Sequence, residues 1–194
     1  MVIISILGDK GMDVFEAIQE RRSIRSYTDK PVEREKIEKI LEAGRLAPSA
    51  RNSEPWHFIV VTNAEKRKAL SKGLYAKFVS HAPLVIVACG DKKASADWYA
   101  VDVSLAVENM ILTAINEGLG TCCVGSFSEK DIMEILKIPD NYEVIVMLVI
   151  GYAREKLDLS SKLLHLVRSR KTISEVASEE TFGKALVPKK VLED

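Results

Sequence analysis

The sequence predicts one α+β domain of 194 residues, in which helices alternate with short strands. Two segments, 83–89 and 144–150, are apolar without alternation, which is typical of strands covered on both faces. The segments around them carry helix-capping pairs and apolar residues at helical spacing. With 47% hydrophobic and 29% charged residues, the chain can bury one substantial core and is short for two domains.

The first helix is predicted from a capping box of Asp13 and Glu16. Val14 and Ile18 share one face of this helix, which should end near Arg22. The elements expected next are a helix from Pro31 to the loop at Leu46, a strand over 56–61, a short helix over 66–72 and the buried strand over 83–89.

The longest helix is expected over 97–117, where Val101, Leu105, Leu112 and Ile115 share one side and apolar residues occupy most other sides. We therefore expect it to be the central, buried helix. The elements expected after it are a brief strand over 121–124, a helix that begins at Ser128 with Asp131 in its first turn, and the buried strand over 144–150.

The last segment, 152–194, is more polar, yet it keeps Leu163, Leu166, Val167 and Phe182. These are too many apolar side chains for a free tail. If the residues before 152 already form a complete hydrophobic core, a second copy of the chain would cover these side chains. This segment is therefore predicted to be an arm exchanged within a homodimer.

Charge and cysteine usage narrow the function classes. Lysine plus arginine equals aspartate plus glutamate at 28 each, so nothing in the global charge favours a nucleic-acid or membrane partner. The apolar start lacks a basic leader and a cleavage site, and no apolar run is long enough for a spanning helix. Three cysteines and three histidines lack disulfide or metal-ligand spacing. We expect a soluble cytoplasmic protein without a metal site.

Two basic clusters are candidates for binding one anion. The first covers 21–27 and has the sequence Arg-Arg-Ser-Ile-Arg-Ser-Tyr, and the second covers 168–171 and has the sequence Arg-Ser-Arg-Lys. Arginine offers bidentate, charge-assisted hydrogen bonds to phosphate, and serine adds a short neutral one. The alternative interpretation is a solvated helix end and a solvated arm, where the arginines only complement the helix dipole.

Two loops could approach a flat ligand. The loop over 47–56 is Ala-Pro-Ser-Ala-Arg-Asn-Ser-Glu-Pro-Trp, and its small residues and Asn52 suit close contact with a heterocycle. The segment 118–126 carries three glycines that could expose backbone amides. Each loop could equally be an ordinary connection, and no G-x-G-x-x-G fingerprint of a Rossmann dinucleotide site is present.

The order R-R-S-x-R-x-Y, then A-P-S-A-x-N-x-x-P-W, then G-L-G near the central helix, then R-S-R resembles the FMN-dependent nitroreductase family. The resemblance covers nearly the whole chain apart from its first dozen and last fifteen or so residues. It implies a mixed, mostly antiparallel central sheet flanked by helices, with a C-terminal arm, about 152–194, exchanged between the subunits of a homodimer.

The resemblance also implies which residues would contact FMN. The phosphate and ribityl chain would be held by Arg21, Arg22 and Ser23, joined by the late basic residues Arg168 and Arg170. Arg25 would lie beside the flavin pyrimidine. The loop reaching across the dimer would contribute Pro48, Ser49, Ala50 and Asn52. The segment along the flavin ring, with an amide near N5, would be Val124, Gly125 and Ser126.

The implied activity is ping-pong transfer of electrons from NAD(P)H through FMN to a small flat acceptor such as a nitroaromatic or a quinone. No side chain need act as acid or base, so no catalytic residue is predicted. Glu54 stands where the family often has glutamine, and the segment 90–97 is short. Alternatives are a specialised flavin enzyme of the same fold, dehalogenase-like or flavin-fragmenting, a non-catalytic flavin-binding protein, and a plain anion-binding module.

Overall fold

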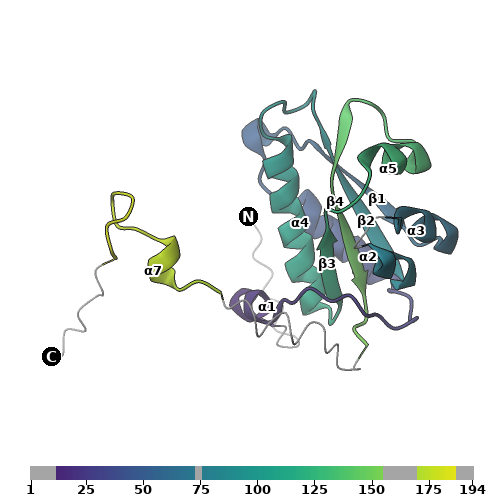
Figure 1. Ribbon diagram of the computed structural model, residues 1–194, viewed down its shortest axis with the longest axis horizontal. Helices are drawn as coiled ribbons and strands as arrows, with labels where there is room; N and C mark the ends of the chain where they lie inside the picture. Colours follow the sequence, from purple (N-terminus) through teal and green to yellow (C-terminus); the bar gives the residue numbers. More distant parts are fainter. Residues whose placement is uncertain (1–11, 73–75, 155–169, 187–194) are drawn as a thin grey trace, which may run out of the picture. The chain divides into compact units, whose positions relative to one another are not determined.

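The computed structural model describes residues 12–72, 76–154 and 170–186 (Figure 1). The chain divides into two compact units, Met1–Arg154 and Glu155–Asp194, which are described separately. Among the described elements, the first unit holds the sheet and every helix except the short one at Ile173–Val176. The second unit corresponds to the predicted arm.

One sheet organises the first unit. Its spatial order is β1-β2-β4-β3, and all three neighbouring pairs are antiparallel. The strands are β1 (Trp56–Val61), β2 (Leu84–Asp91), β3 (Gly120–Val124) and β4 (Tyr142–Gly151). A single-residue bridge from Ser23 to Thr121 adds a parallel contact at the edge formed by β3. The predicted α+β class with a mostly antiparallel sheet is confirmed.

The helices largely follow the sequence predictions. They are α1 (Val14–Glu20), α2 (Arg34–Arg45), α3 (Ala64–Leu70), α4 (Tyr99–Asn116) and α5 (Glu129–Leu136), with short 3-10 turns η1 (Ala50–Asn52) and η2 (Lys77–His81). Capping side chains of Asp13 and Ser128 begin α1 and α5 as predicted. The short third helix begins earlier than expected, because the Asn63 side chain accepts a hydrogen bond from the Lys66 amide at 3.0 Å. No helix in the described part of the chain is long and apolar enough to cross a membrane.

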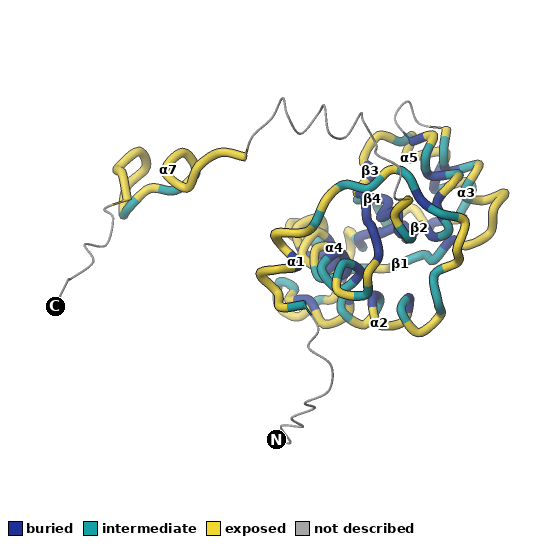
Figure 2. The backbone as a smooth tube through the Cα atoms, turned by 90° about the horizontal axis from the view of Figure 1, so that it is seen from below, coloured by how far each residue is buried: buried dark blue, intermediate teal, exposed yellow. Residues whose placement is uncertain are grey.

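Helices cover both faces of the sheet, so the fold has three layers. α2 and α4 pack on the face that carries Leu84, Ile86 and Leu148. α3, α5 and η2 pack on the opposite face (Figure 1), which carries Val85 and Met147. Burial on both faces is the physical reason that β2 and β4 are apolar without alternation. Figure 2 shows the buried backbone concentrated in the centre of this unit.

The longest helix, α4, is buried along one side only, which corrects the expectation of a fully buried helix. Its buried residues include Val103, Val107 and Met110. Val101 and Leu105, from the stripe that the sequence singled out, remain 48% and 44% exposed. α1 likewise exposes its apolar residues Val14, Phe15 and Ile18 and buries Ala17. The first unit therefore presents apolar surface on two helices.

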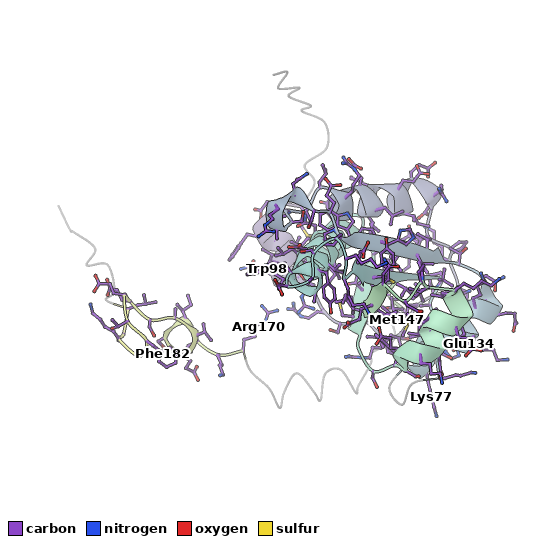
Figure 3. All side chains as sticks on the ribbon, turned by 90° about the horizontal axis from the view of Figure 1, so that it is seen from above. Lys77, Trp98, Glu134, Met147, Arg170 and Phe182 are labelled. Atoms are coloured by element: carbon purple, nitrogen blue, oxygen red, sulfur yellow. The ribbon has the colours of Figure 1, made fainter. Side chains whose placement is uncertain are left out.

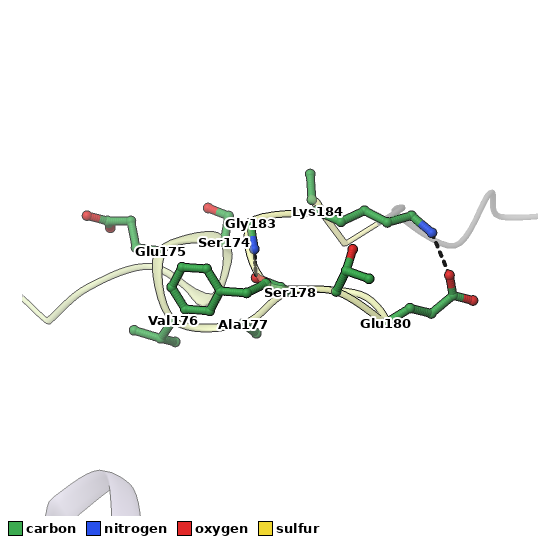
Figure 4. Close-up of a pocket in the computed structure, with 11 residues that line it drawn as sticks. Ser174, Glu175, Val176, Ala177, Ser178, Glu180, Gly183 and Lys184 are labelled. Carbon is green, nitrogen blue, oxygen red and sulfur yellow. Dashed lines mark hydrogen bonds and ion pairs between the residues drawn. The ribbon is translucent and has the colours of Figure 1, made fainter.

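The second unit contains α7 (Ile173–Val176), which begins with the predicted capping pair: the Glu175 carboxylate accepts a hydrogen bond from the Thr172 amide at 2.8 Å. A turn follows in which the Gly183 amide donates to Ser178 Oγ at 2.9 Å (Figure 4). Within residues 170–186, the part of this unit that the structure describes, no side chain is buried. Its exposed large apolar side chains, among them the labelled Phe182 in Figure 3, are Ile173, Val176, Phe182 and Leu186.

Candidate functional site

The basic segment 21–25 is fixed along the edge strand β3. The Ile24 amide donates to the Thr121 carbonyl at 2.8 Å, and Ser23 forms its bridge to the same residue. Gly120 permits this approach, because a Cβ there would lie 2.8 Å from Ile24 Cγ1. The segment that carries the predicted phosphate ligands is thus held against the strand that leads to Gly125.

Tyr27 anchors the far end of the same segment. Its ring is buried, and its hydroxyl donates to the carbonyls of Ile24 at 2.5 Å and Val149 at 3.3 Å. Burial raises the pKa of this phenol well above its ordinary value, so it remains a donor. The tyrosine of the R-R-S-x-R-x-Y motif therefore has a structural role: its hydrogen bonds fix the backbone path of the segment that carries the arginines.

The thiols of Cys122 and Cys123 on β3 lie close enough to the basic segment for its charges to affect their pKa values. Burial raises the pKa of the Cys122 thiol, while the charges of Arg25 and Arg21 and a hydrogen bond with Ser23 act in the opposite direction. Cys123 lies on the exposed side of β3, yet desolvation by the atoms around its sulfur raises its pKa to about 11. Arg21, Ser23 and Arg25 thus share the surroundings of this strand.

Arg22 behaves differently from its neighbours. Its guanidinium donates to the backbone carbonyls of Gln19 at 2.5 Å and Arg21 at 2.9 Å, at the C-terminal end of α1. Arg22 therefore fits the alternative interpretation given for the first basic cluster, in which an arginine binds the free carbonyls at the C-terminal end of a helix. The geometry separates Arg22 from Arg21 and Arg25, and contact between Arg22 and a phosphate remains a prediction.

The end of β3 is open to solvent. Val124 is buried, but Gly125 and Ser126 are exposed, and a Cβ built on Gly125 would have no neighbour within 4 Å. Backbone groups here are accessible to a ligand. The structure brings Ser23, Arg21 and Arg25 together with β3, the strand that leads to this open end.

The loop with the predicted partner-reaching residues has an unusual backbone. Arg51 and Asn52 have φ values of 55° and 54°, and Glu54 has 45°, all in the left-handed region. The Glu54 amide donates to Ser49 Oγ at 3.0 Å, and the Asn52 side-chain amide lies 3.4 Å from a Glu54 carboxylate oxygen. Glu54 thus accepts a hydrogen bond inside the loop.

This loop is attached to the first turn of α4, through a bond from the Ala50 amide to Asp102 Oδ1 at 3.1 Å. β3 begins after the other end of α4, which is about 27 Å long for its 18 residues. Among the described residues, no hydrogen bond or ion pair joins the loop to Arg21–Arg25 of the same chain. Pro48, Ser49, Ala50 and Asn52 therefore form a separate part of the surface from the basic segment.

The nitroreductase family model matches residues 18–74 and 68–152, which is more than half of the chain and includes the basic segment, the loop and β3. The chain belongs to the nitroreductase family. The predicted family and its oxidoreductase class are confirmed.

Individual relatives agree with this placement. A protein of Archaeoglobus fulgidus whose assigned name is NADH dehydrogenase/NAD(P)H nitroreductase is 38% identical over 154 residues, covering 75% of this chain and 88% of the relative. An FMN-dependent nitroreductase of Clostridium difficile superposes with a TM-score of 0.67 at 39% identity, covering 72% of this chain and 87% of that one. A further nitroreductase family protein of Clostridium difficile gives a TM-score of 0.76 at 34% identity and covers 88% and 99%.

The remaining predicted cofactor ligands lie in the second unit. Arg168 is outside the described residues, and Arg170 is exposed in the part that the structure describes. That unit also has a hollow of about 560 Å³ bounded by residues 174–185 (Figure 4). The hollow has no arginine and lies in a unit formed by the arm alone, so we do not assign the cofactor to it. The meeting of Arg170 with Arg21 stays a prediction.

Sequence reasoning missed Asp102. It is a carboxylate 3% exposed within an apolar helix, and it holds the loop that the sequence singled out. An available signal was an acidic residue between Val101 and Val103, in a helix whose neighbouring positions are apolar.

Proposed function

We propose that this nitroreductase binds FMN and transfers electrons from NAD(P)H to small flat acceptors such as nitroaromatics or quinones. The observation that carries the proposal is the basic segment held along β3 at Thr121, with Arg21 and Arg25 close enough to act on the Cys122 thiol of that strand. The names of two relatives, one FMN-dependent and one using NAD(P)H, support the cofactor and the electron donor.

The residues present fit FMN. Neither Arg21 nor Arg25 forms an ion pair with a described residue, so both charges are available to an anion. Arg21 and Ser23 would hold the phosphate, with Arg168 and Arg170 closing on it from the arm. Arg25 would place a fixed positive charge at the pyrimidine side of the ring.

FMN, when bound, would supply the redox chemistry, taking a hydride from the nicotinamide and passing electrons to the acceptor. The protein would orient the ring through the exposed backbone at Val124, Gly125 and Ser126. Oxidised acceptor and nicotinamide would use the same open face in turn, which is a ping-pong order. No side chain near β3 is needed as an acid or base.

We also propose a homodimer. α1 and α4 leave Phe15, Val101 and Leu105 exposed, and the second unit leaves Phe182 fully exposed. A second copy would cover these apolar surfaces and place its loop of Pro48, Ser49, Ala50 and Asn52 against the flavin. All three cysteines are free thiols, in keeping with a reducing cytoplasm.

The experiment is an FMN titration of Arg21→Ala and a control, followed by protein fluorescence and flavin absorbance. Loss of a charge-assisted hydrogen bond is worth about 1.5–3 kcal/mol, so Arg21→Ala should raise the dissociation constant about 10- to 100-fold. Arg34→Ala is the matched control, because Arg34 is an exposed arginine that pairs with Glu38 on α2 at 2.7 Å. Arg22→Ala should weaken binding less than Arg21→Ala does. An Arg21→Ala protein with the affinity of the wild type would contradict the assignment.

Anaerobic stopped-flow mixing with NADH and NADPH tests turnover. Reduction of the bound flavin, followed by reoxidation with a quinone, is the expected result. A yellow protein that neither nicotinamide reduces would favour the non-catalytic flavin-binding alternative, and a protein reduced by NAD(P)H that ignores nitroaromatics and quinones would favour a specialised enzyme. Equilibrium sedimentation tests the dimer, which Leu105→Asp should dissociate; a wild-type monomer at micromolar concentration would exclude it.

A further inference from the structure

Asp102 is a buried acidic residue that the proposed chemistry does not use. It is 3% exposed, in the first turn of α4, and is surrounded by apolar neighbours on that helix. Oδ1 accepts the Ala50 amide at 3.1 Å, while Oδ2 is buried and has no hydrogen-bond partner among the described residues. Burying a carboxyl group with only one hydrogen bond lowers the stability of the fold. We therefore expect a role for the one bond that it forms, to the Ala50 amide.

The loop at the other end of that bond is strained. Arg51, Asn52 and Glu54 all have positive φ, a region that non-glycine residues rarely occupy and that persists only when the surroundings enforce it. Such strain gathers at ligand clamps. The loop needs an external restraint to keep this shape.

Asp102 provides a hydrogen bond to the loop from another element. The other hydrogen bonds of residues 49–54 in the described structure stay inside the loop, such as Glu54 amide to Ser49 Oγ and Asn52 amide to Ser49 carbonyl. The bond from the Ala50 amide to Asp102 joins the loop to another element. Because α4 is packed against the sheet, it gives the loop a rigid reference.

We infer that Asp102 is a positioning residue, which holds the loop 49–54 in its strained shape so that Ala50 and Asn52 meet the flavin of the partner subunit. This inference rests on the proposed FMN function. Because Asp102 is only 3% exposed, it would not contact cofactor or substrate itself. Its acceptor oxygen acts through the Ala50 amide.

Tryptic cleavage after the exposed Arg51 measures the loop directly, without the cofactor. Proteolysis follows the population of open loop when opening is fast, so Asp102→Ala should be cut at Arg51 about tenfold faster than the wild type. Asp102→Asn keeps an acceptor oxygen and should restore the wild-type rate. Asn109→Ala is the matched control, because it removes another hydrogen bond from α4 to backbone, that of Asn109 Nδ2 to the Ala43 carbonyl at 3.2 Å. If Asp102→Ala does not fold, Asp102→Leu keeps the branching at Cγ, fills the site with methyl groups and also lacks the acceptor.

FMN titration of the same variants tests the link to the cofactor. Asp102→Ala should raise the FMN dissociation constant about tenfold, with Asp102→Asn close to wild type. Wild-type cleavage in Asp102→Ala or Asp102→Leu would overturn the restraint. Faster cleavage with unchanged FMN affinity would overturn the link between restraint and cofactor. Failure of the wild type to bind FMN would instead refute the proposed function, and the cleavage contrast would still test Asp102.

Discussion

Gly120→Ala is a direct test of how the basic segment is held against the sheet. A methyl group at position 120 would lie 2.8 Å from Ile24 Cγ1, 3.0 Å from its Cβ and 3.1 Å from its Cγ2. The Cβ of Ile24 is bonded directly to its backbone, so rotation of the side chain cannot move this atom away from the new methyl group. The segment itself must move from β3, and the 2.8 Å bond from the Ile24 amide to Thr121 must lengthen.

The expected size follows from two opposing effects. Overpacking costs about 1–3 kcal/mol, whereas replacing glycine with alanine regains about 0.5–1 kcal/mol of unfolded-chain entropy. Gly120→Ala should therefore lower the free energy of unfolding by about 0.5–2 kcal/mol. FMN affinity should fall as well, because Ser23 and Arg25 flank the displaced residue.

Urea unfolding followed by circular dichroism, at one fixed protein concentration, measures the change. Ile24→Ala removes both γ carbons, so the Gly120→Ala penalty should shrink in that background, with a coupling of about 1 kcal/mol. Gly125→Ala is the steric control for stability, because no atom lies within 4 Å of a Cβ at that position. Wild-type stability in Gly120→Ala, or full additivity with Ile24→Ala, would refute the close approach.

Three other predictions concern the rest of the first unit. Gly44→Ala would place a methyl 2.9 Å from Met110 Sδ, so we expect urea unfolding to show a loss of up to about 2 kcal/mol, and a gain instead when Met110→Ala has already opened the space. Glu33 has a pKa lowered from 4.5 to about 2, first by the hydrogen bond from Tyr152 and then by that with Lys30. The stability that ionised Glu33 contributes is present above pH 4.5 and is lost as pH falls through 2. Glu33→Gln should therefore melt at a lower temperature than the wild type at pH 7, and this difference should vanish toward pH 2. A difference that stays constant with pH would contradict the prediction. Burial raises the pKa of Cys89 to about 12, and peptide mapping after iodoacetamide treatment should find it modified only on unfolding.

Local patterns in the sequence determined the elements and the family motifs. Continuous apolar runs identified β2 and β4, because burial on both sheet faces leaves no position for a polar residue. Capping side chains of Asp13 and Ser128 identified helix starts, because they satisfy backbone amides within three residues. The order of basic and small-residue motifs pointed to the family that the comparison confirmed.

The tertiary structure decided what each residue contacts. α4 is apolar on most sides, so its periodicity could not tell the buried Val103 from the exposed Val101 and Leu105. The sequence could not separate Arg22, which caps α1, from Arg21, because the difference depends on the path that Tyr27 and Gly120 impose on the segment. Contacts between residues distant in sequence depend on how the chain packs, and local periodicity carries no record of that packing.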